Sequence, residues 1–272
     1  MGEELSLDQI HYETLKVIEK IYEICDMLNI SCVAWYGSML GAIRHKGFIP
    51  WDDDFDIAML RPDYDKFIDY CKTNSFKLGE FKLIDKSVSK KYPFNLARFC
   101  HTGYRMETKE LPDAGMGLFV DIYPLDPVGN SINLARKKIQ WRKKLYSIGW
   151  NSSIKKQIPK TKKGIINKII KFLIYLWAKG KSPHYYYMKY DGLSKLYDYD
   201  SSKYVAVVVW EMSFRAMPKI WFEDVIDVPF ESITVKVPRQ YDKILKQIYG
   251  DYMKLPKKSM QHPTHDYRLY KK

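Results

Sequence analysis

The chain has 272 residues, of which 46% are apolar and 28% charged, and this composition excludes an intrinsically disordered protein. Lysine and arginine outnumber aspartate and glutamate by 45 to 32, so the formal net charge of +13 favours an acidic partner. No run reaches the roughly 18 uninterrupted apolar residues of a membrane-spanning helix, and the acidic N-terminal sequence predicts no signal peptide. We therefore expect a cytoplasmic protein, whose four cysteines, without a CxxC pair, are reduced thiols.

Helical and strand patterns alternate along the first half of the chain. A capping box at Ser6 and Gln9, helical spacing of apolar residues and a proline in a first turn predict helices over 7–29, 39–45 and 61–74. Short apolar runs predict strands at SCVAWYG, FDIAML, FKLID, FNLARFC and GLFVDIY. This alternation predicts an α/β core with a mixed sheet flanked by helices.

The second half of the chain starts with a basic region. We expect a helical insertion over about 131–198, a strand at YVAVVVW, a mixed stretch to Val237, a helix over 239–252 and a polar tail. We divide the chain into a catalytic core (1–130), a basic helical insertion (131–200) and C-terminal strands and a helix that complete the catalytic domain (201–272).

The excess positive charge is confined to that insertion. Sixteen lysines or arginines and no acidic residue lie between Pro127 and Tyr190, whereas the rest of the chain carries 29 basic and 32 acidic residues. Within it, residues 164–182 combine an apolar face with lysines, which is typical of a helix lying on an anionic membrane and equally of a core-packed helix with solvated lysines. A nucleic-acid groove is the least favoured of the three interpretations.

The most informative stretch runs from Trp35 to Met59 and contains an acidic run that leads into a strand. Alternation along the strand places Asp54 and Asp56 on one face and directs Phe55 and Ile57 into the core. Two carboxylates so close repel each other unless a cation lies between them, and oxygen ligands without neighbouring His or Cys favour Mg²⁺ or Mn²⁺. The pattern therefore predicts a metal site.

A third carboxylate, Asp121, lies alone in the apolar strand GLFVDIYPLD, where an unpaired charge would be costly. If this strand lies beside the one that carries Asp54 and Asp56, the three carboxylates converge on one metal. Gly37 and Ser38 precede a short helix whose first N–H groups could hold a phosphate, and Arg44 and Lys46 add positive charge nearby.

An acidic triplet alone is more often a solvated loop, and a Gly-Ser pair before a helix is common. The combination is narrower, because it couples Gly-Ser at a strand end with Asp-apolar-Asp and a later apolar-Asp-apolar strand. It predicts metal-dependent phosphoryl transfer. The chain lacks HEXXH, GxSxG and a Walker-type glycine loop, which argues against zinc proteases, serine hydrolases and P-loop kinases.

The block GSMLGAIRHKGFIPWDDDFDIAM, followed by RPDYDKF, resembles the LicD/fukutin family of phosphotransferases, which have the nucleotidyltransferase fold. GLFVDIYPLD and VPRQYDKILKQIYGDYMKLP also resemble landmarks of that family, and the basic insertion does not. The resemblance implies transfer of phosphocholine from CDP-choline to a cell-surface glycan precursor (teichoic acid, lipopolysaccharide or capsule), with release of CMP. Relatives transfer other phosphorylated alcohols, so glycerol phosphate or ribitol phosphate from a CDP-alcohol stays open.

The resemblance also implies roles for individual residues. By motif match, Asp54 and Asp56 bind Mg²⁺ with Asp121 as the third acid, and Gly37 and Ser38 face the nucleotide phosphates. Asp52 and Asp53 match the acidic run and form its turn or support the ligands. The family often has a pair of histidines after the YGD segment, but His262 and His265 are here split by two residues, so we assign neither a role.

Three further assignments stay open. Asp121 is our candidate to orient or deprotonate the acceptor hydroxyl. Arg98 either steadies the leaving diphosphate or is a surface residue of its strand. A choline group would need an aromatic cage, for which the sequence offers many aromatic residues and no way to choose among them.

The favoured hypothesis is a phosphotransferase that binds a CDP-alcohol and a lipid-linked glycan acceptor, as a peripheral protein at the inner face of the cytoplasmic membrane. The basic insertion would then dock the enzyme on an anionic membrane surface. One alternative is a nucleotidyltransferase acting on RNA or a small molecule, because the same fold and acids permit that reaction. A second is an inactive membrane-binding protein.

Overall fold

The structure is a computed structural model, and it describes residues 2–109, 111–153, 165–182, 184–186, 188, 196–209, 214–263 and 265–272. Its α-helices are α1 (Leu7–Leu28), α2 (Tyr36–Arg44), α3 (Arg61–Thr73), α4 (Ile132–Ser153), α5 (Ile165–Ala178) and α7 (Tyr241–Tyr249). Its strands are β1 (Val33–Ala34), β2 (Asp56–Leu60), β3 (Phe81–Ile84), β4 (Ala97–His101), β5 (Tyr104–Thr108), β6 (Leu118–Pro127), β7 (Tyr204–Ala206), β8 (Met217–Pro218), β9 (Val225–Phe230), β10 (Ile233–Pro238) and β11 (Tyr267–Lys271).

The central sheet is mixed and has the order β1-β2-β6-β4-β3. Strand β2 runs parallel to β6, whereas β1 pairs with β2, and β4 with both β3 and β6, in antiparallel fashion. The far end of β6 pairs with β7, which pairs with β8. Strand β6 is buried along its whole length, so the strand that carries Asp121 lies at the centre of the fold.

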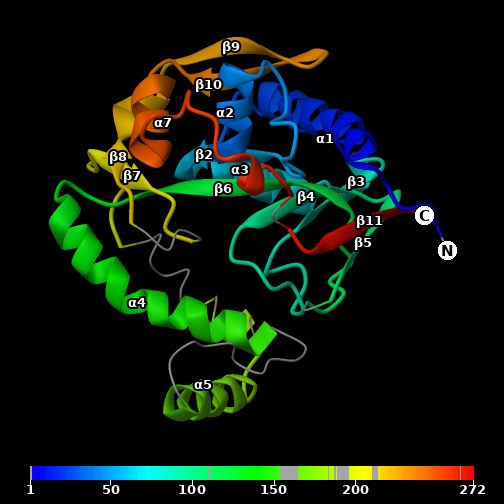
Figure 1. Cartoon of the computed structure of the whole chain (residues 1–272). Coiled ribbons are helices and arrows are strands. Elements are labelled where there is room, and N and C mark those ends of the chain that lie inside the picture. The colour runs from blue at the N-terminus through cyan, green and yellow to red at the C-terminus, as the bar shows by residue number, and fades with distance from the viewer. Residues whose placement is uncertain are drawn as a thin grey trace.

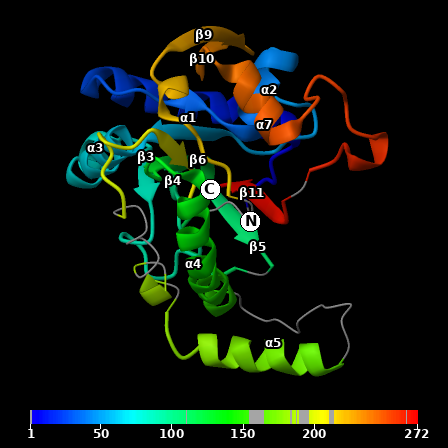
Figure 2. The same ribbon diagram turned by 90° about the vertical axis from the view of Figure 1, so that its left-hand side faces the viewer.

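Helices cover this sheet unevenly (Figures 1 and 2). Helices α1 and α3 contact each other and β6, and α1, α2, α7 and the β9–β10 hairpin lie on one side of β6 in both views. Helices α4 and α5 lie on the other side, and α5 is farthest from the sheet. The core between the sheet and the first group of helices is apolar and contains fully buried Trp35, Phe55, Phe67 and Phe99.

The predicted fold class is confirmed, and so are the strongest local signals. Helix α1 begins at Ser6 with both capping-box hydrogen bonds formed, and ends at Asn29, whose positive φ is typical of a helix end. Helix α3 has Pro62 in its first turn, as predicted. Two helices, α4 and α5, lie in the basic region, part of which (154–164 and 189–195) falls outside the described residues. The three-part division of the chain stays a prediction.

Several predicted bounds were wrong. The run SCVAWYG forms only the two-residue strand β1, and α2 begins at Tyr36, where a φ of 41° turns the chain sharply. Gly37 and Ser38 therefore lie inside the first turn of α2, not before it. Strand β7 covers only the first three residues of YVAVVVW, whose last residue is not described. Strand β5 was missed, and β9, β10 and β11 were expected only as C-terminal strands without bounds. Their burial alternates or is partial, so their sequences lack continuous apolar runs.

Strand β11 joins the C-terminal end of the chain to β5. It pairs with β5, and the N-terminal segment pairs with it in turn through the Leu5 N–H, which donates to the Leu269 carbonyl. Helix α1 braces the acidic loop from the same direction, because His11 Nε2 lies 2.6 Å from the Asp52 carbonyl oxygen. The residues before β2 are therefore held by both ends of the chain.

Replacing Phe55 tests how firmly the core fixes the acidic loop. It lies between Asp54 and Asp56 in the sequence, and its ring is fully buried and packs edge-on against Phe48 and Phe230. Phe55→Ala should lower the free energy of unfolding by about 3–5 kcal/mol, because it leaves a cavity, and Phe55→Leu by less than half as much. Urea denaturation followed by circular dichroism measures both values. A small and equal loss of stability in the two variants would contradict the role of Phe55 in fixing the acidic loop.

Candidate active site

Strand register places three charged residues in one row across the sheet. Asp56 of β2 is directly paired with Asp121 of β6, and Asp121 is directly paired with Arg98 of β4. Directly paired residues project to the same face, so the three side chains are neighbours. The Asp121 N–H also donates to the Phe55 carbonyl at 3.0 Å, which extends the pairing toward Asp54. The convergence that the sequence predicted conditionally is therefore present.

One carboxylate oxygen from each of Asp54, Asp56 and Asp121 lies within 4.8 Å of the others. Oxygen Oδ1 of Asp56 is buried without a hydrogen-bond partner, which is costly unless a cation or water engages it. An all-carboxylate set suits a hard cation such as Mg²⁺ or Mn²⁺. On both counts these residues fit a divalent metal, and they could hold one.

Without a metal, burial and mutual repulsion raise the pKa of two of these carboxyls, those of Asp54 and Asp56. Burial, with the charges of Asp52 and Asp121, raises the pKa of Asp54 to about 7, although His265 opposes the rise. Burial and the charges of Asp54 and Asp121 raise the pKa of Asp56 well above its ordinary value. A bound cation would displace protons from these two carboxyls, so cation binding and proton release are coupled.

Arg98 is the permanent counter-charge of the row. It is only 5% exposed, so the surface alternative for this residue was wrong. Its Nε donates to Asp121 Oδ1 at 2.6 Å and its Nη2 to Oδ2 at 3.3 Å, and the guanidinium lies between the rings of Phe94 and Phe119. This two-point contact fixes the orientation of the Asp121 carboxylate.

A second set of residues comes from the C-terminal tail. His265 Nδ1 lies 2.6 Å from Asp53 Oδ1, and its Nε2 lies 3.5 Å from Asp54 Oδ2. Tyr267 donates its hydroxyl to the Asp53 carbonyl at 2.6 Å and stacks on the imidazole. Burial opposes charge on His265, but the hydrogen bond to Asp53 and the charges of Asp54 and Asp53 prevail and raise its pKa to about 9. The sequence analysis assigned no role to His265 and did not single out Tyr267.

Gly37 and Ser38 lie close to the acidic run on the first turn of α2. A Cβ atom on Gly37 would fall 2.4 Å from Asp52 Oδ2, so this approach needs glycine. Ser38 is buried, and its Oγ accepts a hydrogen bond from the Asp56 N–H at 2.8 Å. Ser38 thus fixes the start of the strand that carries Asp56. A contact of either residue with phosphate stays a prediction.

The remaining predicted cations, Arg44 and Lys46, lie at the end of α2 and just after it. Arg44 donates to the Tyr252 carbonyl at 2.7 Å, beyond α7, and Lys46 is exposed in the loop after α2. Neither shares a described contact with the three carboxylates. The roles of Arg44 and Lys46 toward a substrate stay predictions.

Among the aromatic residues near the acidic run, Trp35 is fully buried, which suits core packing rather than a choline cage.

Comparisons with known proteins agree with this geometry. Residues 29–146 match the family described as LicD/FKTN/FKRP, nucleotidyltransferase domain, a range that includes β1, β2, β4, β6 and all three carboxylates. The chain is 29% identical to the lipopolysaccharide cholinephosphotransferase LicD of Haemophilus influenzae over 98% of both chains. The chain is thus similar to the LicD family, through a family match over residues 29–146 and a relative that spans almost its whole length. An uncharacterised protein of Rickettsia prowazekii is 26% identical over 47% of this chain and 54% of its own length.

Metal binding should stabilise the fold in a pH-dependent way. Saturating Mg²⁺ or Mn²⁺ should raise the thermal unfolding midpoint, and more at about pH 8 than at about pH 5.5. At the lower pH, Asp54, with a pKa of about 7, and Asp56, with its raised pKa, hold protons that the cation has to displace. Differential scanning fluorimetry with EDTA as the reference measures the shift.

Asp56→Asn should abolish this response and raise the midpoint of the metal-free chain at about pH 8, because it removes a buried, repelled charge. Asp69→Asn, which changes an exposed acid on α3, is the matched control and should respond like the wild type. An unchanged metal response in Asp56→Asn would contradict the assigned site.

The Arg98–Asp121 contact should show strong energetic coupling. Arg98→Met should lower the free energy of unfolding by about 3–5 kcal/mol, because Asp121 stays buried after its counter-charge is lost. The double variant Arg98→Met/Asp121→Asn should recover part of that loss. Urea denaturation of the wild type, both single variants and the double variant gives the coupling energy; strictly additive losses would refute the pairing.

Proposed function

We propose that this chain transfers phosphocholine from CDP-choline to a hydroxyl of a cell-surface glycan precursor and releases CMP. The similarity to the LicD family supports a phosphotransferase. Support for phosphocholine comes from the Haemophilus relative, which is named a lipopolysaccharide cholinephosphotransferase and matches over 98% of its length. The observation that carries the chemistry is the convergence of Asp54, Asp56 and Asp121.

The three carboxylates would hold Mg²⁺ or Mn²⁺, and the bound cation would neutralise the diphosphate of the donor. The chain's own residues make that arrangement rigid before substrate arrives. Arg98 orients Asp121 through two hydrogen bonds, Ser38 anchors the backbone of Asp56, and Asp53 holds the imidazole of His265 beside Asp54. Rigid positioning is the main contribution a protein makes to phosphoryl transfer.

In the proposed reaction, the acceptor hydroxyl oxygen forms a bond to the phosphorus that bears choline. The bond from that phosphorus to the bridging oxygen of the diphosphate breaks, and CMP leaves with the bonding electron pair. Asp121, beside the reacting groups, would orient the hydroxyl and accept its proton. Gly37 and Ser38, on the first turn of α2, would face the nucleotide phosphates.

The finer assignments belong to the same proposal. The acceptor would be a lipid-linked precursor of a lipopolysaccharide-type or teichoic-acid-type glycan, and the enzyme would act at the inner face of the cytoplasmic membrane. CDP-glycerol and CDP-ribitol are the alternative donors, since the residues that read the alcohol are not assigned. No helix in the described part of the chain is both long and apolar enough to span a bilayer.

CMP release from CDP-choline tests the proposal. Purified protein with Mg²⁺ should release CMP, detected by chromatography, from CDP-choline more than from CDP-glycerol or CDP-ribitol, and EDTA should stop it. Asp54→Asn and Asp56→Asn should each lower the rate at least about 100-fold, because each removes a ligand of the cation. Asp69→Asn should retain the wild-type rate.

The alternative reaction has its own signature in this assay. Consumption of nucleoside triphosphates without CMP release from any CDP-alcohol would replace the proposal with nucleotidyl transfer. Release from CDP-glycerol or CDP-ribitol alone would keep the site and change the donor. Full activity of either aspartate variant would contradict the assigned carboxylates.

A further inference from the structure

Helix α5 exposes apolar side chains almost along its whole length. Eight of them are between 42% and 74% exposed: Ile166, Ile169, Ile170, Phe172, Leu173, Ile174, Leu176 and Trp177. The other exposed apolar side chains of the described residues are mostly scattered over separate elements. A continuous apolar patch of this kind is unfavourable in water and marks an interaction surface.

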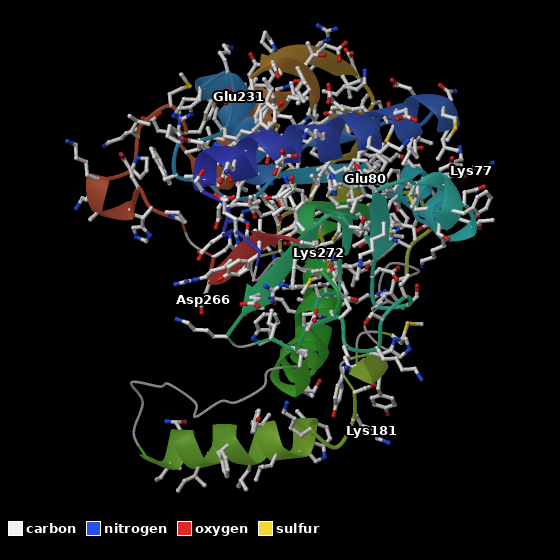
Figure 3. All side chains as sticks on the ribbon, turned by 90° about the vertical axis from the view of Figure 1, so that its right-hand side faces the viewer. Lys77, Glu80, Lys181, Glu231, Asp266 and Lys272 are labelled. Atoms are coloured by element: carbon white, nitrogen blue, oxygen red, sulfur yellow. The ribbon has the colours of Figure 1, made fainter. Side chains whose placement is uncertain are left out.

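These side chains form a wide stripe on the helix, which we call the α5 apolar face. Ile166, Ile169, Ile170, Leu173 and Trp177 are spaced three, four and seven residues apart, so they lie on one side. Figure 3 shows α5 apart from the sheet, at the end of the molecule opposite Glu231, with Lys181 beyond its C-terminal end. Exposed Tyr185 and Met188 continue the apolar surface past that end.

The C-terminal end of α5 is anchored while this face stays uncovered. Ala178 is fully buried, and its carbonyl accepts a hydrogen bond from the Tyr186 hydroxyl at 3.3 Å. Lys179 Nζ donates to the carbonyl of Ser152, near the end of α4, at 3.1 Å. The C-terminal end of the helix is therefore held by these hydrogen bonds, by buried Ala178 and by a contact of the Trp177 ring with Tyr186, whereas the exposed residues before Trp177 take no part.

Charge and length together point to one occupant. The region between Pro127 and Tyr190 carries sixteen basic residues and no acidic one, which complements an anionic surface. Fourteen helical residues extend about 21 Å, less than the roughly 30 Å of a bilayer's hydrocarbon core. Such a helix lies in the plane of the interface, with its apolar side in the acyl region and lysines among the headgroups.

We propose that α5 is a membrane-docking helix whose apolar face inserts into the surface of an anionic lipid bilayer. This inference does not depend on the identity of the transferred group. It gives the basic insertion a role separate from catalysis, because α5 lies away from the sheet that carries the three carboxylates.

Vesicle flotation of the full chain tests the proposal. The wild type should float with phosphatidylcholine vesicles that contain phosphatidylglycerol, and high salt or phosphatidylcholine alone should reduce the bound fraction at least about tenfold. The double variant Ile169→Asp/Leu173→Asp should lose binding to the same extent. Both positions are exposed, so the fold, checked by circular dichroism, should not change.

Phe76→Asp is the matched control. Phe76 is 79% exposed and precedes Lys77, which Figure 3 places far from Lys181. This variant places an aspartate at an exposed apolar residue away from α5 and should float like the wild type. All three proteins should release CMP equally from a soluble donor, so failure of docking and failure of the reaction are distinguishable.

Two outcomes would overturn the proposal. One is equal vesicle binding, or none, in the wild type and the double variant. The other is a wild-type dimer in sedimentation velocity without lipid that the double variant converts to a monomer, together with no vesicle binding. The α5 apolar face would then bind a second copy of this chain.

Discussion

Two like charges held side by side in a buried sheet are the constraint on which the rest of the site depends. The parallel register of β2 and β6 places Asp56 directly beside Asp121, and the chain before β2 adds Asp54. In a buried environment, such a cluster is unfavourable unless positive charge or protons compensate it. Two surrounding residues supply positive charge to the cluster: Arg98 of β4 contacts Asp121, and His265 of the C-terminal tail contacts Asp53 and Asp54.

The compensation is incomplete in a way that suits a cation. Arg98 engages both oxygens of Asp121, whereas Asp56 Oδ1 stays buried without a hydrogen bond. The raised pKa of Asp54 and of Asp56 shows that their negative charge is not fully compensated. A fold optimised for stability alone would replace these groups with apolar residues. The apolar core beneath them, which includes the ring of Phe55, holds the cluster together in spite of its repulsion.

Local patterns in the sequence were enough to predict the elements that form the site. They were not enough to predict which strands pair with one another. Helices α1 and α3 and strand β2 follow from capping residues and periodicity, and alternation alone places Asp54 and Asp56 on one face. That Asp121 joins them depends on strand order, which the sequence supports only through its family resemblance. Arg98 could not be assigned, because its partner is set by the β4–β6 register, and His265 contacts Asp53 across 212 residues through a polar tail without a strong strand signal. That the α5 apolar face is exposed could be learned only from the structure, because a helix that packs on a core and a helix that lies on a membrane have the same amphipathic pattern.

The central claim is that the donor's diphosphate binds at the three carboxylates, and phosphorus NMR with Mn²⁺ tests it most directly. Protein-bound Mn²⁺ broadens the resonances of phosphorus atoms a few ångströms away. The account predicts that a substoichiometric amount of wild-type protein with Mn²⁺ broadens both phosphorus resonances of CDP-choline well beyond the effect of free Mn²⁺, and that Asp56→Asn removes the excess. Equal broadening with the wild type and Asp56→Asn would contradict it.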